Sequence, residues 1–390
     1  MKILFVINNY YMKGNGMAAS ARRTVKYLKD MGHEVRVLAG PNKHAAQPQP
    51  EYCLKEFKFP FVQGIIDAQG FSYASSDPKI MEEAIRWADV VHLEEAFVLE
   101  AKAIKIAKKS GKPLTATYHL HPENITNSLG PLRYWKGLNR ALLCMGRDYV
   151  FNHCAYVQCP TESVLDRLRR YHFKSNLALI SNGLIPDACI RPQEMPEDYE
   201  DPSRPLKVVY IGRLSKEKDQ PTLLQAMRFS SYAKRIQLIF AGIGPDEKRI
   251  KRMAHKLYQE GVLSYEPQFV FLDRDGLRKL SAGADLCAHC ATIEVEGLSI
   301  MEAMQQAAVP VIAVGPYSGT SQFALDRRSR FPEKNPEALA QRIDYWLSHP
   351  KERWEMGKKY AAHMEQYDIR KSAEALQDMF EKAMDLNNKA

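Results

Sequence analysis

The sequence predicts an α/β protein made of two doubly wound, Rossmann-like domains joined by a linker. The chain has 390 residues, of which 45% are hydrophobic, and this is more than a single core usually serves. Short apolar runs alternate with helical patterns over two separate stretches of the chain. Between these stretches, residues 186–205 ("PDACIRPQEMPEDYEDPSRP") are dense in proline and acid without any period, which is typical of a linker.

The first predicted domain, residues 1–185, alternates strands with helices. Its expected strands are "KILFVIN", "HEVRVLA", "ADVVHL", "PLTATYH", "AYVQCP" and "LALISNG", and helical spacing covers residues 18–31, 97–109 and 161–171. Thr161 stands at the N-cap position of the third helix. Repeated strand–helix–strand units indicate a parallel sheet that is covered on both faces.

The second predicted domain, residues 206–367, repeats the same alternation. Its expected strands are "LKVVYIG", "IQLIFAG", "QFVFL", "ADLCAHC" and "VPVIAV", and its expected helices cover residues 220–229, 246–260, 299–307, 336–347 and 352–365. A further helix, residues 369–384, falls in a separate C-terminal segment, residues 368–390. In such sheets ligands bind beyond the carboxyl ends of the strands, and two facing domains would put the site in the cleft between them.

Composition narrows the partners and the compartment. The formal net charge is +9, which favours a phosphorylated small molecule, an anionic membrane or a nucleic acid. The N-terminal apolar run is about six residues, too short for a signal sequence or a membrane span. Seven scattered cysteines predict reduced thiols in the cytoplasm. The pair in "CAHC" (287–290) is expected in the core, because a zinc site would need a second ligand pair.

Two loops at expected strand ends carry candidate anion-binding groups. Arg213 and Lys218 in "GRLSKEKD" follow the first strand of the second domain, where two cations suit a diphosphate. The alternative is a solvated basic turn. In the first domain, "NNYYMKGNGMAAS" contains Gly16 before a helix, whose N-terminus favours an anion. An ordinary flexible turn is the alternative there.

The stretch "EVEGLSIMEAM" places three glutamates in an apolar run. Ser299 and Glu302 fit a capping box, with Ser299 as the N-cap. This arrangement would leave the amides of residues 297–300 free to bind a second anion. It does not explain Glu294 or Glu296, and a carboxylate is costly to bury without a partner.

Three further patterns leave alternatives open. His119 and His121 follow the expected strand "PLTAT". Each could be a metal ligand, an acid–base group or a hydrogen-bonded loop residue. The last interpretation is favoured more for His121 than for His119, which is closer to the strand end. In "LDRDG", Asp275 is expected to cap a helix rather than hold a metal. The basic aromatic segment 131–147 would lie on an anionic membrane or pack as a surface helix on its own domain.

Taken together, these residues resemble the retaining GT-B glycosyltransferases of family GT4 (glycosyl transferases group 1). The resemblance rests on Glu294 and Glu302 in "EVEGLSIMEAM", on "GRLSKEK", and on "TYH", "CPTESV", "SNG" and "AGIGP" in the expected order. Two positions depart from the family pattern. Glu296 stands where relatives carry an aromatic residue, and Asp273 stands where relatives carry a glycine.

The resemblance implies roles for individual residues. Arg213, Lys218, Gly16 and the amides of Leu298 and Ser299 would contact the donor diphosphate or its sugar. Glu302, Arg274 and Gly244 would bind the nucleotide. Glu294 and His119 are the expected catalytic residues beside the transferred sugar, and the last helix would cross back onto the first domain. No metal or other cofactor is expected.

The implied function is transfer of a hexosyl group, with retention and without a metal, from a nucleotide-diphosphate sugar to a glycan or lipid-linked acceptor. A UDP-sugar is the expected donor and polysaccharide biosynthesis the expected context. Nucleic acid is not an expected partner. Peripheral contact with the inner face of the plasma membrane is expected. The alternatives are a sugar-nucleotide epimerase or phosphorylase on the same fold, and a non-catalytic basic membrane-associated binding protein.

Overall fold

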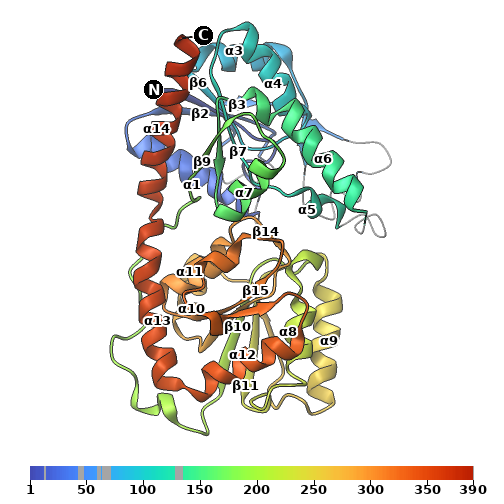
Figure 1. Ribbon diagram of the computed structural model, residues 1–390, viewed down its shortest axis with the longest axis vertical. Helices are drawn as coiled ribbons and strands as arrows, with labels where there is room; N and C mark the ends of the chain where they lie inside the picture. Colours follow the sequence, from blue (N-terminus) through green and yellow to red (C-terminus); the bar gives the residue numbers. More distant parts are fainter. Residues whose placement is uncertain (13–14, 43–47, 59–62, 64–71, 128–134, 390) are drawn as a thin grey trace. The chain divides into compact units, whose positions relative to one another are not determined.

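The computed structural model describes residues 1–12, 15–42, 48–58, 63, 72–127 and 135–389 (Figure 1). Contacts between Cα atoms divide the chain into two compact units. Met1–Gly183 together with Ile369–Ala390 make the first unit, and Leu184–Asp368 make the second. Each unit is a Rossmann-like domain, with a parallel sheet and helices packed against it, so the α/β class predicted from the sequence is confirmed.

The first unit is built on a seven-stranded sheet of order β3-β2-β1-β6-β7-β8-β9, in which all neighbours are parallel. Its strands are β1 (Lys2–Val6), β2 (Glu34–Ala39), β3 (Tyr52–Cys53), β6 (Val90–Leu93), β7 (Leu114–Thr117), β8 (Tyr156–Cys159) and β9 (Asn176–Leu179). A separate antiparallel pair joins β4 (Glu56–Phe57) to β5 (Tyr73–Ala74). Its helices are α1 (Gly16–Asp30), α3 (Pro78–Trp87), α4 (Val98–Lys109), α5 (Pro122–Thr126), α6 (Lys136–Tyr149), α7 (Glu162–Arg170) and α14 (Ile369–Asn388).

The last helix of the chain, α14, contributes to the core of the first unit. Its buried face includes Leu376 and Phe380, which cluster with Ile3 and Phe5 of the interior strand β1. The ring of Phe380 also packs 5.2 Å from that of the buried His92 in β6. The chain therefore returns to the first unit after completing the second.

The second unit is built on a six-stranded parallel sheet of order β12-β11-β10-β13-β15-β17. Its strands are β10 (Leu206–Ile211), β11 (Ile236–Ala241), β12 (Gln268–Val270), β13 (Leu286–His289), β15 (Val309–Val314) and β17 (Arg330–Pro332). A short parallel pair joins β14 (Ile293–Glu294) to β16 (Tyr317–Ser318). Its helices are α8 (Gln220–Ala226), α9 (Glu247–Gln259), α10 (Arg274–Ala282), α11 (Leu298–Gln305), α12 (Pro336–Ser348) and α13 (Pro350–Met364).

Residues 186–205, expected as a linker, pack within the second unit. The amide of Ile190 donates to Gln306 Oε1 at 3.0 Å, and Arg191 Nε donates to a backbone carbonyl at 2.9 Å. Arg204 binds the buried Asp285 at 2.7 Å. These contacts are made by single residues that do not recur at helix or strand spacing. The sequence of the segment therefore does not predict them.

Helix α10 begins at Arg274, two residues earlier than "GLRKL" suggests. Asp273, and not Asp275 as predicted, is its N-cap, because the Asp273 side chain accepts the amide of Gly276 at 2.9 Å. Asp275 lies in the first turn and pairs with Lys279 at 2.7 Å. The prediction chose the wrong aspartate of the Asp-x-Asp pair because both stand close to the helix start.

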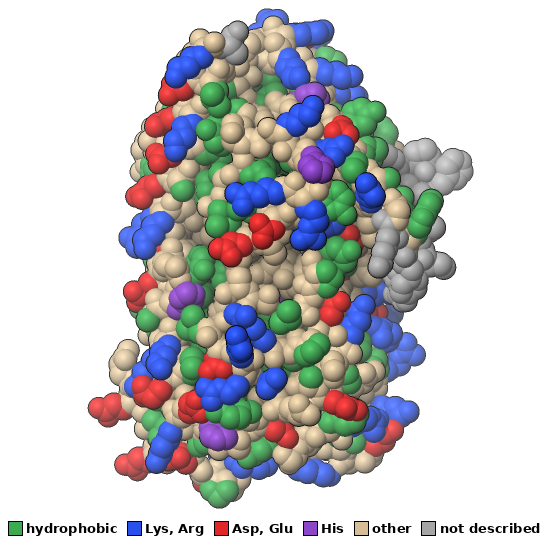
Figure 2. Space-filling view, in the orientation of Figure 1, with side chains coloured by type: hydrophobic (Ala, Val, Ile, Leu, Met, Phe, Trp, Pro, Cys, Tyr) green, Lys and Arg blue, Asp and Glu red, His purple; other side chains and the backbone are tan. Residues whose placement is uncertain are grey.

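Charge is spread widely over the described surface. On the face drawn in Figure 2, Lys and Arg side chains are scattered among Asp and Glu side chains over both units. Among the described residues, no helix is long and apolar enough to span a bilayer.

Candidate active site

The two predicted phosphate-binding cations lie directly after β10, at the carboxyl edge of the second sheet. Arg213 follows the strand by two residues, and Lys218 ends a short 3-10 turn. Two neighbouring side chains hold the backbone of this turn, since Tyr210 Oη donates to the Lys218 carbonyl at 2.5 Å and Gln220 Nε2 donates to the Arg213 carbonyl at 2.8 Å. The turn lies at the carboxyl end of a strand and its backbone is held in place, as expected for a ligand site in such a sheet.

Lys218 and Glu294 form an ion pair in which both side chains are largely covered, at 18% and 17% exposed. His289 lies 3.7 Å from the same carboxylate. Burial raises the pKa of Glu294, but Lys218 and His289 outweigh it and bring this pKa below its usual value. Burial lowers the pKa of His289 to about 4, so this imidazole is neutral at pH 7. Glu294 is therefore an ionised carboxylate beside one cation.

The capping box predicted for α11 is wrong. The N-cap is Gly297, in the left-handed region at φ 86°, and the helix begins at Leu298. Ser299 Oγ donates instead to the carbonyl of Ile211 at 3.0 Å, which ties the helix start to the end of β10. A Cβ at Gly297 would stand 2.8 Å from Thr320 Oγ1. Both the positive φ and this close approach therefore favour glycine at position 297.

The first turn of α11 supplies fewer amides than the capping box suggested. The amide of Ile300 donates to the Gly297 carbonyl at 3.1 Å. The amides of Leu298 and Ser299 precede the first possible intrahelical acceptor, as in any helix. These two amides are the pair for which the resemblance implies a contact with phosphate or sugar. Glu302 lies on the same side of the helix, one turn further on.

The third glutamate of the stretch, Glu296, is directed into the protein. It is 2% exposed, whereas Glu294 and Glu302 are only partly covered. Glu296 therefore differs in placement from the two glutamates for which the resemblance implies ligand roles.

The two other nucleotide-binding candidates of the second unit have local structural partners. A Cβ at Gly244 would stand 2.2 Å from the Leu214 carbonyl oxygen, so this glycine lets the loop after β11 contact the loop after β10. Arg274, in the first turn of α10, forms an ion pair with Asp187 while its side chain stays 48% exposed. Packing between the two loops thus explains why residue 244 is a glycine. Arg274 is oriented by the carboxylate of Asp187.

In the first unit, His119 is held by a carboxylate that follows the neighbouring strand. His119 Nε2 lies 2.5 Å from Oε2 of Glu94, and both side chains are almost fully covered, at 6% and 3% exposed. Burial raises the pKa of Glu94, but His119 and His92 outweigh it and bring this pKa below its usual value. A carboxylate that binds one imidazole nitrogen fixes the ring and leaves the other nitrogen for a ligand.

His121 has a structural role, as the loop reading favoured. It is 2% exposed, and its Nδ1 lies 3.0 Å from Arg167 Nη1 and 3.3 Å from Tyr118 Oη. Arg167 in turn binds Glu123 at 2.7 Å. Burial lowers the pKa of His121 to about 3, with a contribution from Arg167, so the ring is neutral. This cluster fixes the start of α5.

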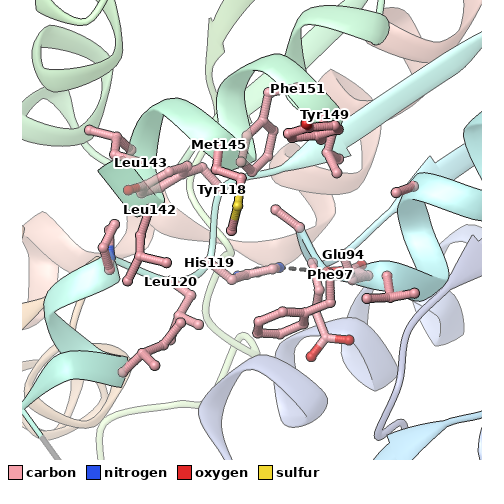
Figure 3. A pocket seen from close by; sticks show the side chains of 18 of the residues that line it. Glu94, Phe97, Tyr118, His119, Leu120, Leu142, Leu143, Met145, Tyr149 and Phe151 are labelled. Carbon is pink, nitrogen blue, oxygen red and sulfur yellow. Dashed lines mark hydrogen bonds and ion pairs between the residues drawn. The ribbon is translucent and has the colours of Figure 1, made fainter. Parts of the chain in front are cut away.

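Beside His119 lies a cavity of about 470 Å³ within the first unit. Figure 3 shows Leu120 and Leu142 on one side of the His119 ring, Phe97 with Glu94 on the other, and Met145 above the ring in this view. Helix α6 therefore turns apolar side chains toward the cavity. Of the basic aromatic segment 131–147, residues 131–134 lie outside the described residues.

Gly16, the remaining diphosphate candidate, is the first residue of α1 in the first unit. The N-cap Asn15 accepts the amide of Ala18 through its side chain at 3.2 Å, as in a typical helix start. A Cβ at Gly16 would meet no atom within 4 Å. Packing inside the unit therefore does not require glycine at this position.

Cysteine and metal chemistry have little support in the described residues. Cys287 and Cys290 are free and buried, as expected for core cysteines, and burial raises the pKa of the Cys287 thiol to about 12. Across the described ranges, no group of three or more His, Cys, Asp or Glu side chains is placed to hold a metal ion.

Sequence reasoning missed two residues that the structure places in contact with candidates. Glu94 is the partner of His119. The sequence does indicate that Glu94 has a partner, because a carboxylate directly after the buried strand "ADVVHL" is costly to bury alone. His289 lies beside Glu294. No sequence spacing predicts this contact, because it arises where the loop after β13 brings Glu294 back toward the end of that strand.

Comparison with known proteins agrees with this architecture. The family described as Glycosyltransferase Family 4 matches residues 14–188, and the family described as Glycosyl transferases group 1 matches residues 193–363. The chain therefore belongs to the family 4 glycosyltransferases.

Individual relatives are more distant. The GDP-mannose-dependent alpha-mannosyltransferase of Mycolicibacterium smegmatis is 23% identical over 80% of this chain and 79% of its own. The catalytic domain of cholesterol-alpha-glucosyltransferase from Helicobacter pylori is 38% identical over 42% of this chain and 100% of its own, with a TM-score of 0.38.

Two solved structures cover nearly the whole chain. Anabaena HepE in complex with UDP and glucose is 16% identical over 98% of this chain and 100% of its own, with a TM-score of 0.69. Sucrose-phosphate synthase from Thermosynechococcus elongatus is 14% identical over 98% of both chains, with a TM-score of 0.71. These likenesses confirm the GT-B fold that the sequence predicted. The protein is thus a glycosyltransferase of the GT-B type.

Proposed function

We propose that this glycosyltransferase moves a hexosyl group from a nucleotide-diphosphate sugar to a hydroxyl of a glycan or lipid-linked acceptor, with retention of configuration. The observation that carries the proposal is the arrangement at the carboxyl edge of the second sheet. There Lys218 pairs with Glu294, and Ser299 ties the first turn of α11 to the end of β10, the strand that Arg213 follows. In this proposal Arg213, Lys218 and the first amides of α11 bind the diphosphate, and Glu294 faces the transferred sugar.

The charges suit the departure of a diphosphate. As the bond from sugar C1 to the diphosphate oxygen breaks, negative charge grows on the leaving group and positive charge on the sugar ring. Arg213, Lys218 and the amides of Leu298 and Ser299 would stabilise the leaving group. The ionised Glu294 would stabilise the ring. Two cations and a helix start would supply the stabilisation that a metal ion supplies elsewhere, so we propose a metal-independent reaction.

Retention follows if the acceptor attacks on the face that the diphosphate leaves. The acceptor oxygen then bonds to C1, and its proton passes to the departing diphosphate, which is the nearest base on that face. His119, fixed by Glu94, would orient the sugar or the acceptor hydroxyl through its second nitrogen. Glu302 and Arg274 would bind the nucleotide, and Gly16 would allow the backbone of the first unit to approach the donor.

The donor nucleotide is the open part of the proposal. A UDP-sugar is the expected donor, and the likeness to a fold that was solved with UDP and glucose supports it. The relative named for GDP-mannose makes a guanine nucleotide the direct competitor. Both belong in the same test.

The test is incubation of the full chain with UDP-, GDP- and ADP-sugars and a panel of acceptors, with and without a chelator. We expect nucleotide release with one donor, unchanged by the chelator, and a product whose anomeric configuration matches that of the donor sugar by NMR. Absence of release with every donor would reject the proposal. An inverted product would reject retention alone, and loss of turnover with the chelator would reject metal independence alone.

A further inference from the structure

The cavity beside His119 is mostly apolar, although the proposed reaction needs an acceptor with a polar hydroxyl. Its apolar wall comes from α6 and the residues after it, from the start of α4 and from the loop after β7. Several of these side chains are large and exposed: Val98 is 66% exposed, Met145 52% and Tyr149 67%. Soluble proteins seldom gather exposed apolar side chains around a hollow unless a ligand or a partner covers them.

His119 and the residues beside it give the cavity polar groups at one place in its wall. Glu94 binds the ring, and Thr117 lies at the end of the neighbouring strand β7. Lys102 and Lys105, both exposed, contribute to the lining from α4. The cavity therefore offers a fixed hydrogen-bonding group beside a wide apolar surface. A free saccharide, which has hydroxyls on every side, would leave most of its hydroxyls unpaired against such a wall.

We infer that this cavity binds the apolar body of the acceptor and that the acceptor is a hydroxyl-bearing lipid. This inference deepens the proposed function and rests on it. The lipid hydroxyl lies toward His119, and its hydrocarbon lies against Val98, Leu142 and Met145. In the reaction the hydroxyl oxygen bonds to sugar C1, the bond from C1 to the diphosphate breaks, and the hydroxyl proton leaves with the diphosphate.

The size of the cavity supports a single hydrocarbon body. About 470 Å³ falls within the usual range for cavities that enclose a small-molecule ligand. An acyl chain and a fused-ring body share this chemistry, so both are tested. The proposal predicts that affinity follows the amount of hydrocarbon buried until the cavity is full.

The binding experiment uses butyl, hexyl and octyl glycerol ethers below their micelle concentrations, without donor, on the full chain. Each added pair of methylenes is expected to tighten binding roughly ten-fold. Met145→Glu and Val98→Glu should abolish this dependence, because a carboxylate would stand in the apolar wall. Both side chains are exposed, so folding is not at stake. Leu386→Glu, at a 44% exposed position of α14 outside the cavity, is the matched control and should bind like the unmodified protein.

The turnover experiment offers octyl glycerol, a cyclodextrin-solubilised sterol and free hexoses as acceptors, together with the active donor. Transfer to either lipid, reduced at least ten-fold in Met145→Glu and unchanged in Leu386→Glu, supports the inference and identifies the kind of body. Transfer to free hexoses alone, or a chain-length dependence equal in Met145→Glu and the unmodified protein, overturns it. If no donor is turned over but the chain-length dependence holds, the proposed function fails and the apolar ligand site stands.

Discussion

Lys218 and Glu294, the residues expected to hold the donor phosphate and the donor sugar, are paired with each other in the structure. The pair is largely covered, and the neutral ring of His289 lies beside it. Removal of one partner would leave the other charge poorly compensated, which costs more than the loss of an exposed ion pair. A donor that binds here must share Lys218 with Glu294, and the three ammonium protons of lysine allow this.

Lys218→Ala should strongly reduce sugar transfer while the protein stays folded. The variant removes a cation from the leaving diphosphate, and loss of one such group lowers kcat by roughly 10²–10³-fold. Nucleotide release and the thermal unfolding midpoint are the two measurements. Lys216→Ala, at an exposed position of the same turn, is the matched control and should keep its activity. A Lys218→Ala enzyme with near-normal kcat would remove Lys218 from the phosphate site.

Glu94→Gln should lower turnover through His119 rather than directly. The amide keeps the size of the side chain but loses the charge that fixes the ring at 2.5 Å. We expect kcat to fall by about 10–100-fold, the usual effect of losing the partner that orients a functional histidine. The decisive measurement is a double-mutant cycle with His119→Ala, in which the two effects should fall well short of adding. Fully additive effects would show that Glu94 and His119 act separately.

Gly297→Ala should destabilise the second unit. At φ 86° an alanine is strained, and its Cβ would stand 2.8 Å from Thr320 Oγ1. The expected loss is roughly 1–3 kcal/mol in the free energy of unfolding, measured by denaturant titration. Gly283→Ala, at an ordinary negative φ with its nearest contact at 3.4 Å, is the control and should change the stability little. An undiminished stability in Gly297→Ala would mean that the turn relaxes.

Gly16→Ala separates ligand approach from packing. No atom lies within 4 Å of the added Cβ, and alanine favours a helix more than glycine does, so stability should not fall. If the donor phosphate approaches the backbone here, KM for the donor should rise about ten-fold or more, in line with the loss of roughly one favourable contact. Steady-state kinetics with the donor varied measure this. An unchanged KM would show that Gly16 lies away from the donor.

The sequence carried enough information for the fold, and the reason is periodicity. Strands that are buried on both faces appear in the sequence as continuous apolar runs, and "KILFVIN" is one of them. Such runs predict β1 and β10. Most predicted helices agree with the structure within a few residues. Helix α3 was missed, although Asp77 and Pro78 form a typical helix start.

The site was only partly predictable. The resemblance to the family implies that Lys218 and Glu294 both face the donor, but their contact with each other depends on the loop after β13, in which β14 pairs with β16. Serine is a common N-cap, which is why the sequence predicts Ser299 at that position, whereas in the structure Gly297 is the N-cap and Ser299 Oγ donates to the Ile211 carbonyl. The apolar wall beside His119 could not be seen, because it is assembled from helices that are separate in the chain.

Acidification should weaken the second unit partly through His289. Its pKa is lowered by burial to about 4 from the usual 6.5, so the unfolded chain binds more protons between these values and stability falls as the pH drops through this window. Between pH 7 and pH 5 the loss from this single group is roughly 2 kcal/mol. His289→Asn cannot titrate here and should lose correspondingly less, by denaturant titration at both pH values. His255→Asn, at an exposed position of α9, should follow the unmodified protein. Equal losses in His289→Asn and the unmodified protein would show that His289 does not carry the acid sensitivity.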